Sequence, residues 1–248
     1  MGKGVLITIV VVAVVIIAAG VWLGLGYAIG GASGPVVNED RRVSEFDKVK
    51  VSGGGTLIIT SGEQPGLRIE GRRDALDRIR VEVEGDTLSI GERWDWLRFG
   101  PFWDMGEITY YLSAPTLVSV ELSGAVGVKN EAWLKGDVLD LDCSGSSVVD
   151  LDVELQTLNI RASGSSDITL RGSTAELSLH ASGSTRVGAR DLVAGTVTVD
   201  CSGSSDIVVN ATERLSIDAS GSSDISYLGD PAVESDISGS GGLERLSE

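Results

Sequence analysis

The stretch Leu158-Asn159-Ile160-Arg161-Ala162-Ser163-Gly164-Ser165-Ser166-Asp167-Ile168-Thr169-Leu170 decides the fold of this chain. Apolar and polar residues alternate on both sides of a Ser-Gly pair, which is typical of two short β-strands with one buried face. Glycine adopts positive φ without steric cost, so the pair suits the turn between the strands.

The same pattern repeats along the chain. Seven Ser-Gly pairs follow one another at nearly regular spacing, beginning at Ser123, Ser144, Ser163, Ser182, Ser202, Ser220 and Ser238. A unit of about 19 residues cannot bury its apolar face alone, so units must stack on a shared core. Counterpart strands then pair in parallel, about 4.8 Å apart. The sequence predicts an all-β, single-domain parallel β-helix, with serine hydroxyls bonding to turn backbone or to one another.

The two cysteines test this register. Cys143 and Cys201 each precede a Ser-Gly pair, where other repeats hold mostly small residues. Three rungs separate the two sulfurs, or about 14 Å, whereas the Cα atoms of a disulfide lie within about 7 Å. We therefore expect two free, buried thiols.

The rest of the body is predicted to be less regular. Residues 45–112 alternate like strands and are interpreted as irregular first rungs, with one helical turn at Asp74 to Ile79 and an aromatic insertion at 92–106. Residues 113–242 hold the regular repeats. Residues 30–44 are expected to form a flexible linker and residues 243–248 a tail.

The N-terminus indicates a membrane anchor. After a short head, residues 1–4, an uncharged apolar run extends over residues 5–29. A helix of that length spans about 37 Å, enough to cross a hydrocarbon core of about 30 Å. A cleaved secretory signal is the alternative, although its apolar core is normally shorter. We expect a single-pass anchor in the cell membrane with the β-domain extracytoplasmic, where Asn210-Ala211-Thr212 is a candidate N-glycosylation site.

Several motifs resemble a known family. They are the opening Phe46-x-x-Val49-x-Val51, the strand Gly85 to Ile90, Ala114-Pro115-Thr116-Leu117 before Leu122-Ser123-Gly124, and the serial Ser-Gly-Ser-Ser-Asp turns. Together, over about residues 45–242, they resemble the head GIN domain family, named as putative auto-transporter adhesins. The resemblance implies a right-handed β-helical extracytoplasmic domain with an adhesin-like role, and it brings no catalytic residues with it.

The net charge and the aromatic residues limit the classes of binding partner that we expect. The net charge of −16 disfavours nucleic acid, because no basic patch opposes it. Surface polysaccharide or an envelope protein is a more compatible partner. Exposed aromatic rings stack on sugars, so the candidate ligand-binding residues are those of the insertion: Trp94, Trp96, Phe99, Phe102 and Trp103. Alternatively, this insertion is a loop that covers the first rungs.

Two columns of ionisable residues accompany the Ser-Gly pairs. Behind each turn lies a column with Asp167, Arg186, Asp206 and Asp224, whose aspartates are weak calcium candidates because the nonapeptide calcium repeat is missing. Before each pair lies a second column with Asp142, Arg161, His180, Asp200 and Asp218. It holds the only histidine and is interpreted as a solvated face.

No feature of the sequence requires catalysis or a cofactor. The chain has no nucleophile elbow, phosphate loop, Cys-x-x-Cys pair or metal-spaced histidine cluster. We therefore expect a membrane-anchored, non-catalytic, adhesin-like binding module. The alternative is a carbohydrate-active β-helix enzyme, a lyase or hydrolase that acts along an outward face.

Overall fold

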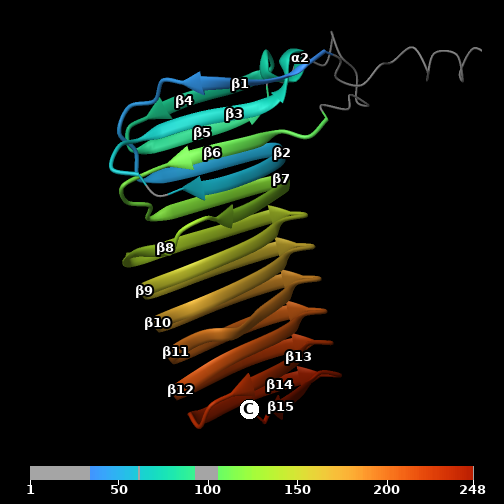
Figure 1. Cartoon of the computed structure of the whole chain (residues 1–248). Coiled ribbons are helices and arrows are strands. Elements are labelled where there is room, and N and C mark those ends of the chain that lie inside the picture. Colours follow the sequence, from blue (N-terminus) through green and yellow to red (C-terminus); the bar gives the residue numbers. More distant parts are fainter. Residues whose placement is uncertain (1–33, 61, 93–105, 248) are drawn as a thin grey trace, which may run out of the picture.

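The chain folds into a β-solenoid of about seven turns with 19-residue rungs. The computed structural model describes residues 34–60, 62–92 and 106–247, and Figure 1 shows their strands stacked in one column. The solenoid strands are β7 (Ser119–Asn130), β8 (Leu134–Gly145), β9 (Val148–Gly164), β10 (Asp167–Gly183), β11 (Arg186–Gly203), β12 (Asp206–Gly221), β13 (Asp224–Leu228), β14 (Ala232–Gly239) and β15 (Gly242–Arg245). The predicted all-β parallel stack is confirmed.

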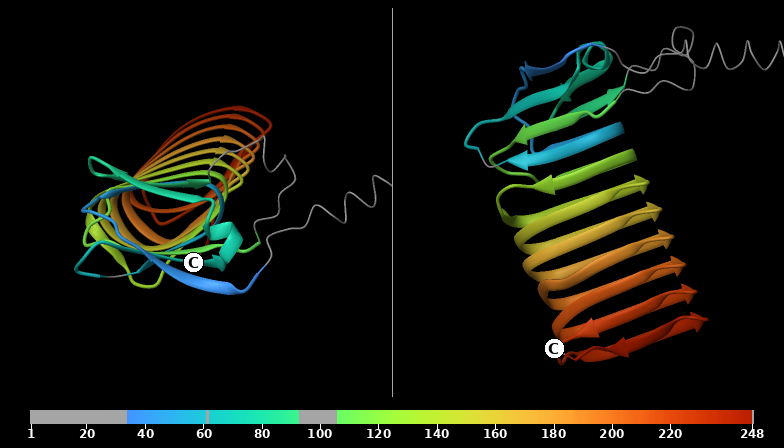
Figure 2. Two further views of the ribbon diagram at one scale, coloured as in Figure 1. Left: turned by 90° about the horizontal axis from the view of Figure 1, so that it is seen from above. Right: turned by 45° about the vertical axis from the view of Figure 1, so that its right-hand side comes forward.

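The register of the stack follows the Ser-Gly pairs. Ser163 of β9 aligns with Ser144 of β8 and with Ser182 of β10, and every pair down to Ser238 continues this alignment. Differences in rung length are absorbed away from the turns. The rung between Ser182 and Ser202, for example, is longer than the one before it, and a register shift appears where β10 meets β11 after Thr169. The stacked rungs are seen from the side in Figure 2.

One continuous core fills the solenoid, because alternate residues of every rung point inward. Leu158 and Ile160 are buried on one side of a turn, and Ile168 and Leu170 are buried on the other. Parallel strands that bury one face over many rungs produce the continuous aliphatic interior expected of stacked repeats.

The cysteine register is confirmed. Cys143 aligns with Ala162, Ala162 with Ala181, and Ala181 with Cys201, so three rungs separate the two thiols. Both are free and buried. Burial raises the pKa of the Cys143 thiol to about 12 and also raises the pKa of Cys201.

The turns depend on glycine for two reasons. Gly164 has φ of 95°, a region that L side chains rarely adopt. A Cβ at this position would also lie 2.5 Å from the carbonyl oxygen of Gly145 in the rung before it. That carbonyl accepts a hydrogen bond of 2.8 Å from the backbone N–H of Ser165. The glycines therefore allow the turn backbones of successive rungs to approach and bond to each other.

Two further rungs precede the regular repeats. Strand β2 (Lys48–Thr60) pairs in parallel with β7, and its Ser52-Gly53 aligns with Ser123-Gly124. On its other side β2 pairs in parallel with β5 (Thr87–Glu92) and with β6 (Thr109–Ser113). Strands β5 and β6 thus share one rung, and the aromatic insertion lies between them in the sequence.

The remaining N-terminal elements differ from the predicted rungs because they pair antiparallel. Strand β1 (Val36–Arg41) pairs with β3 (Gly66–Arg72), β3 pairs with β6, and β4 (Ile79–Glu84) pairs with β5. The helical turn α2 (Arg73–Leu76) begins one residue before the predicted turn and ends before it does. Figure 2 shows these elements gathered at one end of the solenoid.

Both expected terminal segments are partly structured. The linker predicted at residues 30–44 contains strand β1, whose backbone groups are bonded to β3. The tail predicted at residues 243–248 begins inside β15, which pairs with β13. Each strand satisfies backbone groups at an edge of the sheet, which local sequence pattern alone did not indicate.

Within residues 34–60, 62–92 and 106–247, no helix has the length and apolar character needed to cross a bilayer. The predicted head at residues 1–4 and the predicted membrane span at residues 5–29 lie outside these ranges.

Candidate functional site

One column of ionisable side chains runs along the solenoid on the N-terminal side of the Ser-Gly turns. Each member occupies the same outward position, two residues before the serine of its pair, so the parallel register places them one rung apart. We call the following residues the ionisable column: Lys50, Glu121, Asp142, Arg161, His180 and Asp200.

Neighbouring members of this column interact in pairs. Lys50 Nζ lies 2.6 Å from Glu121 Oε2, and His180 Nε2 lies 3.0 Å from Asp200 Oδ2, which is an ion pair when the imidazole is protonated. The guanidinium of Arg161 lies 3.8 Å from the carboxylate of Asp142. These side chains are about half exposed, and such a pair contributes only about 0.2–1 kcal/mol. A ligand could therefore exchange these partners at little cost.

A groove lies between the ionisable column and the serines of the turns. The residues between the two columns, Leu122, Cys143, Ala162 and Ala181, point inward, so no side chain fills the outer surface between the columns. The groove has a volume of about 520 Å³ and includes the hydroxyl groups of Ser144 and Ser163. We call it the turn groove. The groove crosses successive rungs, so each rung from β7 to β11 presents one ionisable side chain and one serine hydroxyl to it.

Asp142 has an unusual environment within the turn groove. Partial burial raises the pKa of its carboxyl group above the ordinary value, and Glu121 and Asp140 add to this rise while Arg161 opposes it. A carboxylate with a raised pKa in a groove is a recognised mark of a functional site, although structural charge networks also produce it.

The serines of the turns act mainly as structure. Ser144 donates to the carbonyl oxygen of Leu122 at 3.3 Å, which agrees with the predicted bonding to turn backbone. Two residues beyond each glycine, a second column of hydroxyls points inward and is buried, including Ser147 and Ser166. Among the described residues, the hydroxyl oxygens of Ser147, Ser166, Thr185 and Ser205 have no hydrogen-bond partner, whereas Ser223 donates to the carbonyl oxygen of Ser220 at 3.4 Å. The first four of these residues also line a second hollow, of about 440 Å³, which lies behind the turns beside Asp167 and Arg186.

The column behind the turns has the predicted register but does not gather carboxylates. Arg186 lies between Asp167 and Asp206, with side-chain distances of 3.3 Å and 3.9 Å. Asp224 occupies the next rung. Within the described ranges, no three metal-ligating side chains come together. The weak calcium candidates Asp167, Asp206 and Asp224 are thus separated by an arginine or by a rung.

The other predicted site residues have different outcomes. Trp94, Trp96, Phe99, Phe102 and Trp103 lie outside the residues that the structure describes. Asn210 lies at a half-buried position within β12, and its side-chain amide donates to the carbonyl oxygen of Arg190 at 3.2 Å. Glycosylation of Asn210 would have to replace that bond.

Sequence reasoning missed the first two members of the ionisable column. Lys50 precedes Ser52-Gly53, a pair that stands far ahead of Ser123-Gly124 in the sequence and so falls outside the regular series. The signal that could have found it is the local pattern: Val49-Lys50-Val51-Ser52-Gly53 has the same alternation as Leu158 to Gly164. Glu121 occupies the equivalent position before Ser123.

Comparison with known proteins agrees with this fold and this repeat. The family described as "Putative auto-transporter adhesin, head GIN domain" matches residues 45–231, which include the first rungs, the ionisable column and most of the repeats. The chain belongs to the head GIN domain family. A search of curated protein sequences finds no match.

Solved structures resemble this head GIN domain over most of its length. A protein described as a putative adhesin from Bacteroides fragilis shares 26% identity with a TM-score of 0.80, over 88% of this chain and 100% of that one. A "putative lipid binding protein" from Parabacteroides distasonis shares 20% identity with a TM-score of 0.70, over 88% and 99% of the two chains. A putative adhesin from Parabacteroides merdae shares 18% identity with a TM-score of 0.63, over the same proportions. The last two likenesses concern the fold alone.

Proposed function

We propose that this head GIN domain is a non-catalytic, adhesin-like binding module, held by an N-terminal membrane anchor and exposed outside the cytoplasm. Its ligand surface is the turn groove. The observation that carries this proposal is the series of three half-exposed, exchangeable side-chain pairs along one groove, each of which spans two successive rungs.

The geometry of the groove favours an extended ligand. Identical backbone positions recur about every 4.8 Å along the stack, which is close to the length of one sugar residue in an extended polysaccharide. The column mixes acidic and basic groups, so it presents donors and acceptors to hydroxyl, amide and carboxylate groups alike. A surface polysaccharide or an envelope protein fits this description. The family name and the likeness to the Bacteroides fragilis protein support an adhesin-like role.

The first test concerns location. Proteinase K is added to intact cells that express the full chain, and the β-domain is followed by immunoblotting. Digestion from outside is expected, with a cytoplasmic protein of the same cells as the protected control. Protection of the β-domain until the cells are lysed would contradict the proposed topology.

The second test concerns the groove. The full chain, solubilised in detergent, is tested for binding to cell envelopes isolated from the producing organism. Arg161→Ala removes a guanidinium from the turn groove, whereas Arg214→Ala removes an exposed guanidinium that does not line the groove. We expect Arg161→Ala to weaken binding and Arg214→Ala to leave it unchanged. Equal binding by both variants would show that the turn groove is not the surface that binds the ligand.

The raised pKa of Asp142 favours a second candidate function, a carbohydrate-active enzyme that acts in the same groove. Asp142 lies one rung from a second acid, Glu121, and glycoside hydrolysis uses two carboxyl groups that flank the scissile bond. In that case Asp142→Asn would abolish release of reducing ends from envelope polysaccharide without weakening binding. If the wild type releases no reducing ends, the enzyme hypothesis is refuted and the binding module remains as the proposed function.

A further inference from the structure

An exposed tryptophan, Trp133, lies at the opposite end of strand β8 from the turn groove. It belongs to the loop between β7 and β8 and is 52% exposed, the largest of the exposed apolar side chains among the described residues. The indole therefore remains open to solvent although many buried positions lie close by. Exposed aromatic side chains of this size are enriched where proteins contact ligands.

The backbone of the next rung but one holds the indole in place. Gly172 of β10 has φ of 116°, and a Cβ at this position would lie 2.5 Å from Cζ3 of Trp133. The indole thus contacts the strand at a place where any other residue would displace it. A ring held by backbone on one side loses little conformational freedom when a ligand contacts the other side.

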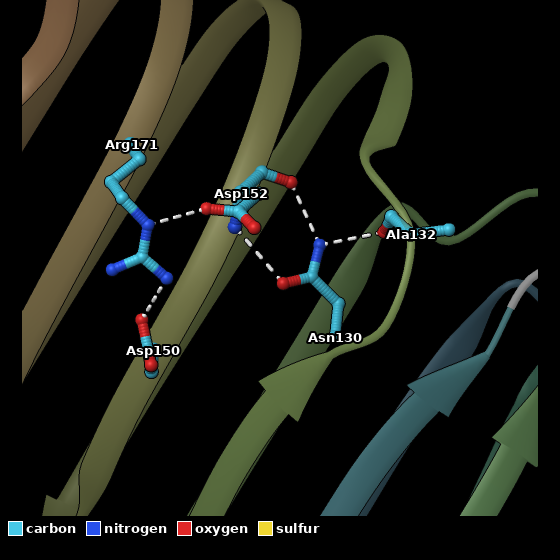
Figure 3. A network of polar contacts seen from close by, with 5 residues as sticks. All are labelled: Asn130, Ala132, Asp150, Asp152 and Arg171. Carbon is cyan, nitrogen blue, oxygen red and sulfur yellow. Dashed lines mark hydrogen bonds and ion pairs between the residues drawn. The ribbon is translucent and has the colours of Figure 1, made fainter.

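Hydrogen bonds fix the loop that carries Trp133. The side-chain amide of Asn130 donates to the carbonyl oxygens of Ala132 and Asp152 at 2.8 and 2.7 Å, and its oxygen accepts from the backbone N–H of Asp152 at 2.9 Å. Figure 3 shows these bonds, together with the ion pairs of Arg171 to Asp150 and Asp152, both of 2.6 Å. The loop is thereby tied to β9 directly and to β10 through Arg171.

A small cleft opens beside the indole. Its volume is about 260 Å³, and its lining includes Trp133, Thr60, Thr116 and Lys135 together with aliphatic side chains such as Leu155. Thr116 is exposed, and the Lys135 ammonium lies 2.6 Å from the carboxylate of Glu154, with both side chains more than half exposed. The cleft thus combines an aromatic residue and aliphatic side chains with hydroxyl groups and with the ammonium group of Lys135.

We propose that this cleft binds one pyranose ring of an envelope polysaccharide. The C–H groups of the sugar ring pack against the indole of Trp133, and the sugar hydroxyls bond to Thr60, Thr116 and Lys135. A cleft of this volume accommodates one ring and not an extended peptide, and its threonine hydroxyls and the Lys135 ammonium offer donors and acceptors to the sugar hydroxyls. The inference rests on the proposed function, because it names the ligand class of a module that binds envelope material.

The test uses the full chain in detergent on a printed array of bacterial and host glycans. We expect the wild type to bind at least one glycan and Trp133→Ala to lower that affinity by about tenfold or more. Trp133→Phe keeps part of the aromatic surface and should retain part of the binding. Val233→Ala is the control, because Val233 is also exposed and apolar but lies in strand β14. Thermal melting of each variant establishes that it is folded.

Two results would overturn the inference. One is a folded Trp133→Ala variant that binds the same glycans as tightly as the wild type. The other is a wild type that binds no glycan on the array. In either case the envelope-binding assay with Arg161→Ala reads out the proposed function separately, because Arg161 lines the turn groove and not the cleft beside Trp133. If Arg161→Ala loses envelope binding and Trp133→Ala keeps it, the proposed binding module is supported and the proposed sugar cleft is refuted.

Discussion

Replacing Gly164 by alanine should destabilise the solenoid strongly, although only one methyl group is added. The residue would have to keep a φ of 95°, which costs about 1–3 kcal/mol for a residue other than glycine. Its Cβ would lie 2.5 Å from the carbonyl oxygen of Gly145, and relieving such a contact in packed structure costs about 1–3 kcal/mol more. We expect a total loss of about 2–6 kcal/mol.

A matched glycine in the next rung but one provides the control. Gly188 of β11 has no positive φ, and a Cβ there would meet its nearest neighbour, the carbonyl oxygen of Ile168, at 3.9 Å. Gly188→Ala should therefore be neutral or stabilising by up to about 1 kcal/mol, since alanine restricts the unfolded chain.

Thermal melting of the two variants, followed by circular dichroism, separates these cases. For a chain of this size a loss of about 1 kcal/mol lowers Tm by about 2–4 °C, so Gly164→Ala should melt at least about 4 °C below the wild type. Equal melting temperatures for Gly164→Ala and Gly188→Ala would refute the argument that close backbone approach fixes glycine in the turns.

Further predictions concern the loop, the thiols and the groove. Asn130→Ala should cost about 2 kcal/mol in chemical denaturation, because it removes three hydrogen bonds to backbone groups, and a loss below about 0.5 kcal/mol would contradict that role. Cys143 and Cys201 should resist iodoacetamide at pH 8 in the folded chain and react after unfolding, since burial raises both thiol pKa values. Rapid labelling of the folded chain would contradict the burial of these two thiols in the core. The raised pKa of Asp142 means that the folded state binds this proton more tightly than the unfolded state, so the contribution of Asp142 to stability improves as pH falls through the folded pKa. Asp142→Asn should then be no less stable than the wild type at pH 7, and its free energy of unfolding should fall relative to that of the wild type in acid. Urea denaturation at both pH values measures this difference. A large loss of stability at pH 7 would mean that the ion pair with Arg161 outweighs the cost of burying the carboxylate.

The regular repeats could be predicted from the sequence because equivalent positions in successive rungs of the stack require the same type of residue. In-register parallel pairing places Ser144, Ser163 and Ser182 in the same environment, so the same residue satisfies each position. The period of the sequence is a direct record of that pairing, and the buried cysteine column followed from it.

The N-terminal part could not be predicted to the same extent, because its pairing leaves no period. Strand β2 pairs with β7 across a gap that contains β3 to β6, so Ser52-Gly53 stands far from the series to which it belongs. Antiparallel partners such as β1 and β3 share no residue pattern, so the composition of Val36 to Arg41 predicts a linker where the structure has a strand. Sheet edges are satisfied by whichever segment reaches them, which local sequence does not show.

Trp133 was missed for a related reason, although a signal existed. The interval from Ser123 to Ser144 is longer than any later interval of the series, and the loop that holds Trp133 separates β7 from β8. Below it, β9 runs without interruption from Val148 to Gly164. An excess of residues in one period, with an aromatic residue inside it, therefore marks a place where the rung opens toward solvent.

The in-register column also has an evolutionary consequence. Each rung contacts only the rungs beside it, so a duplication of about 19 residues inserts one complete layer without altering the packing of distant layers. Such an event lengthens the turn groove by about 4.8 Å and adds one ionisable side chain to it. The reach of the domain and the number of ligand units that it spans are thereby inherited together, and selection can tune both by changing the number of repeats.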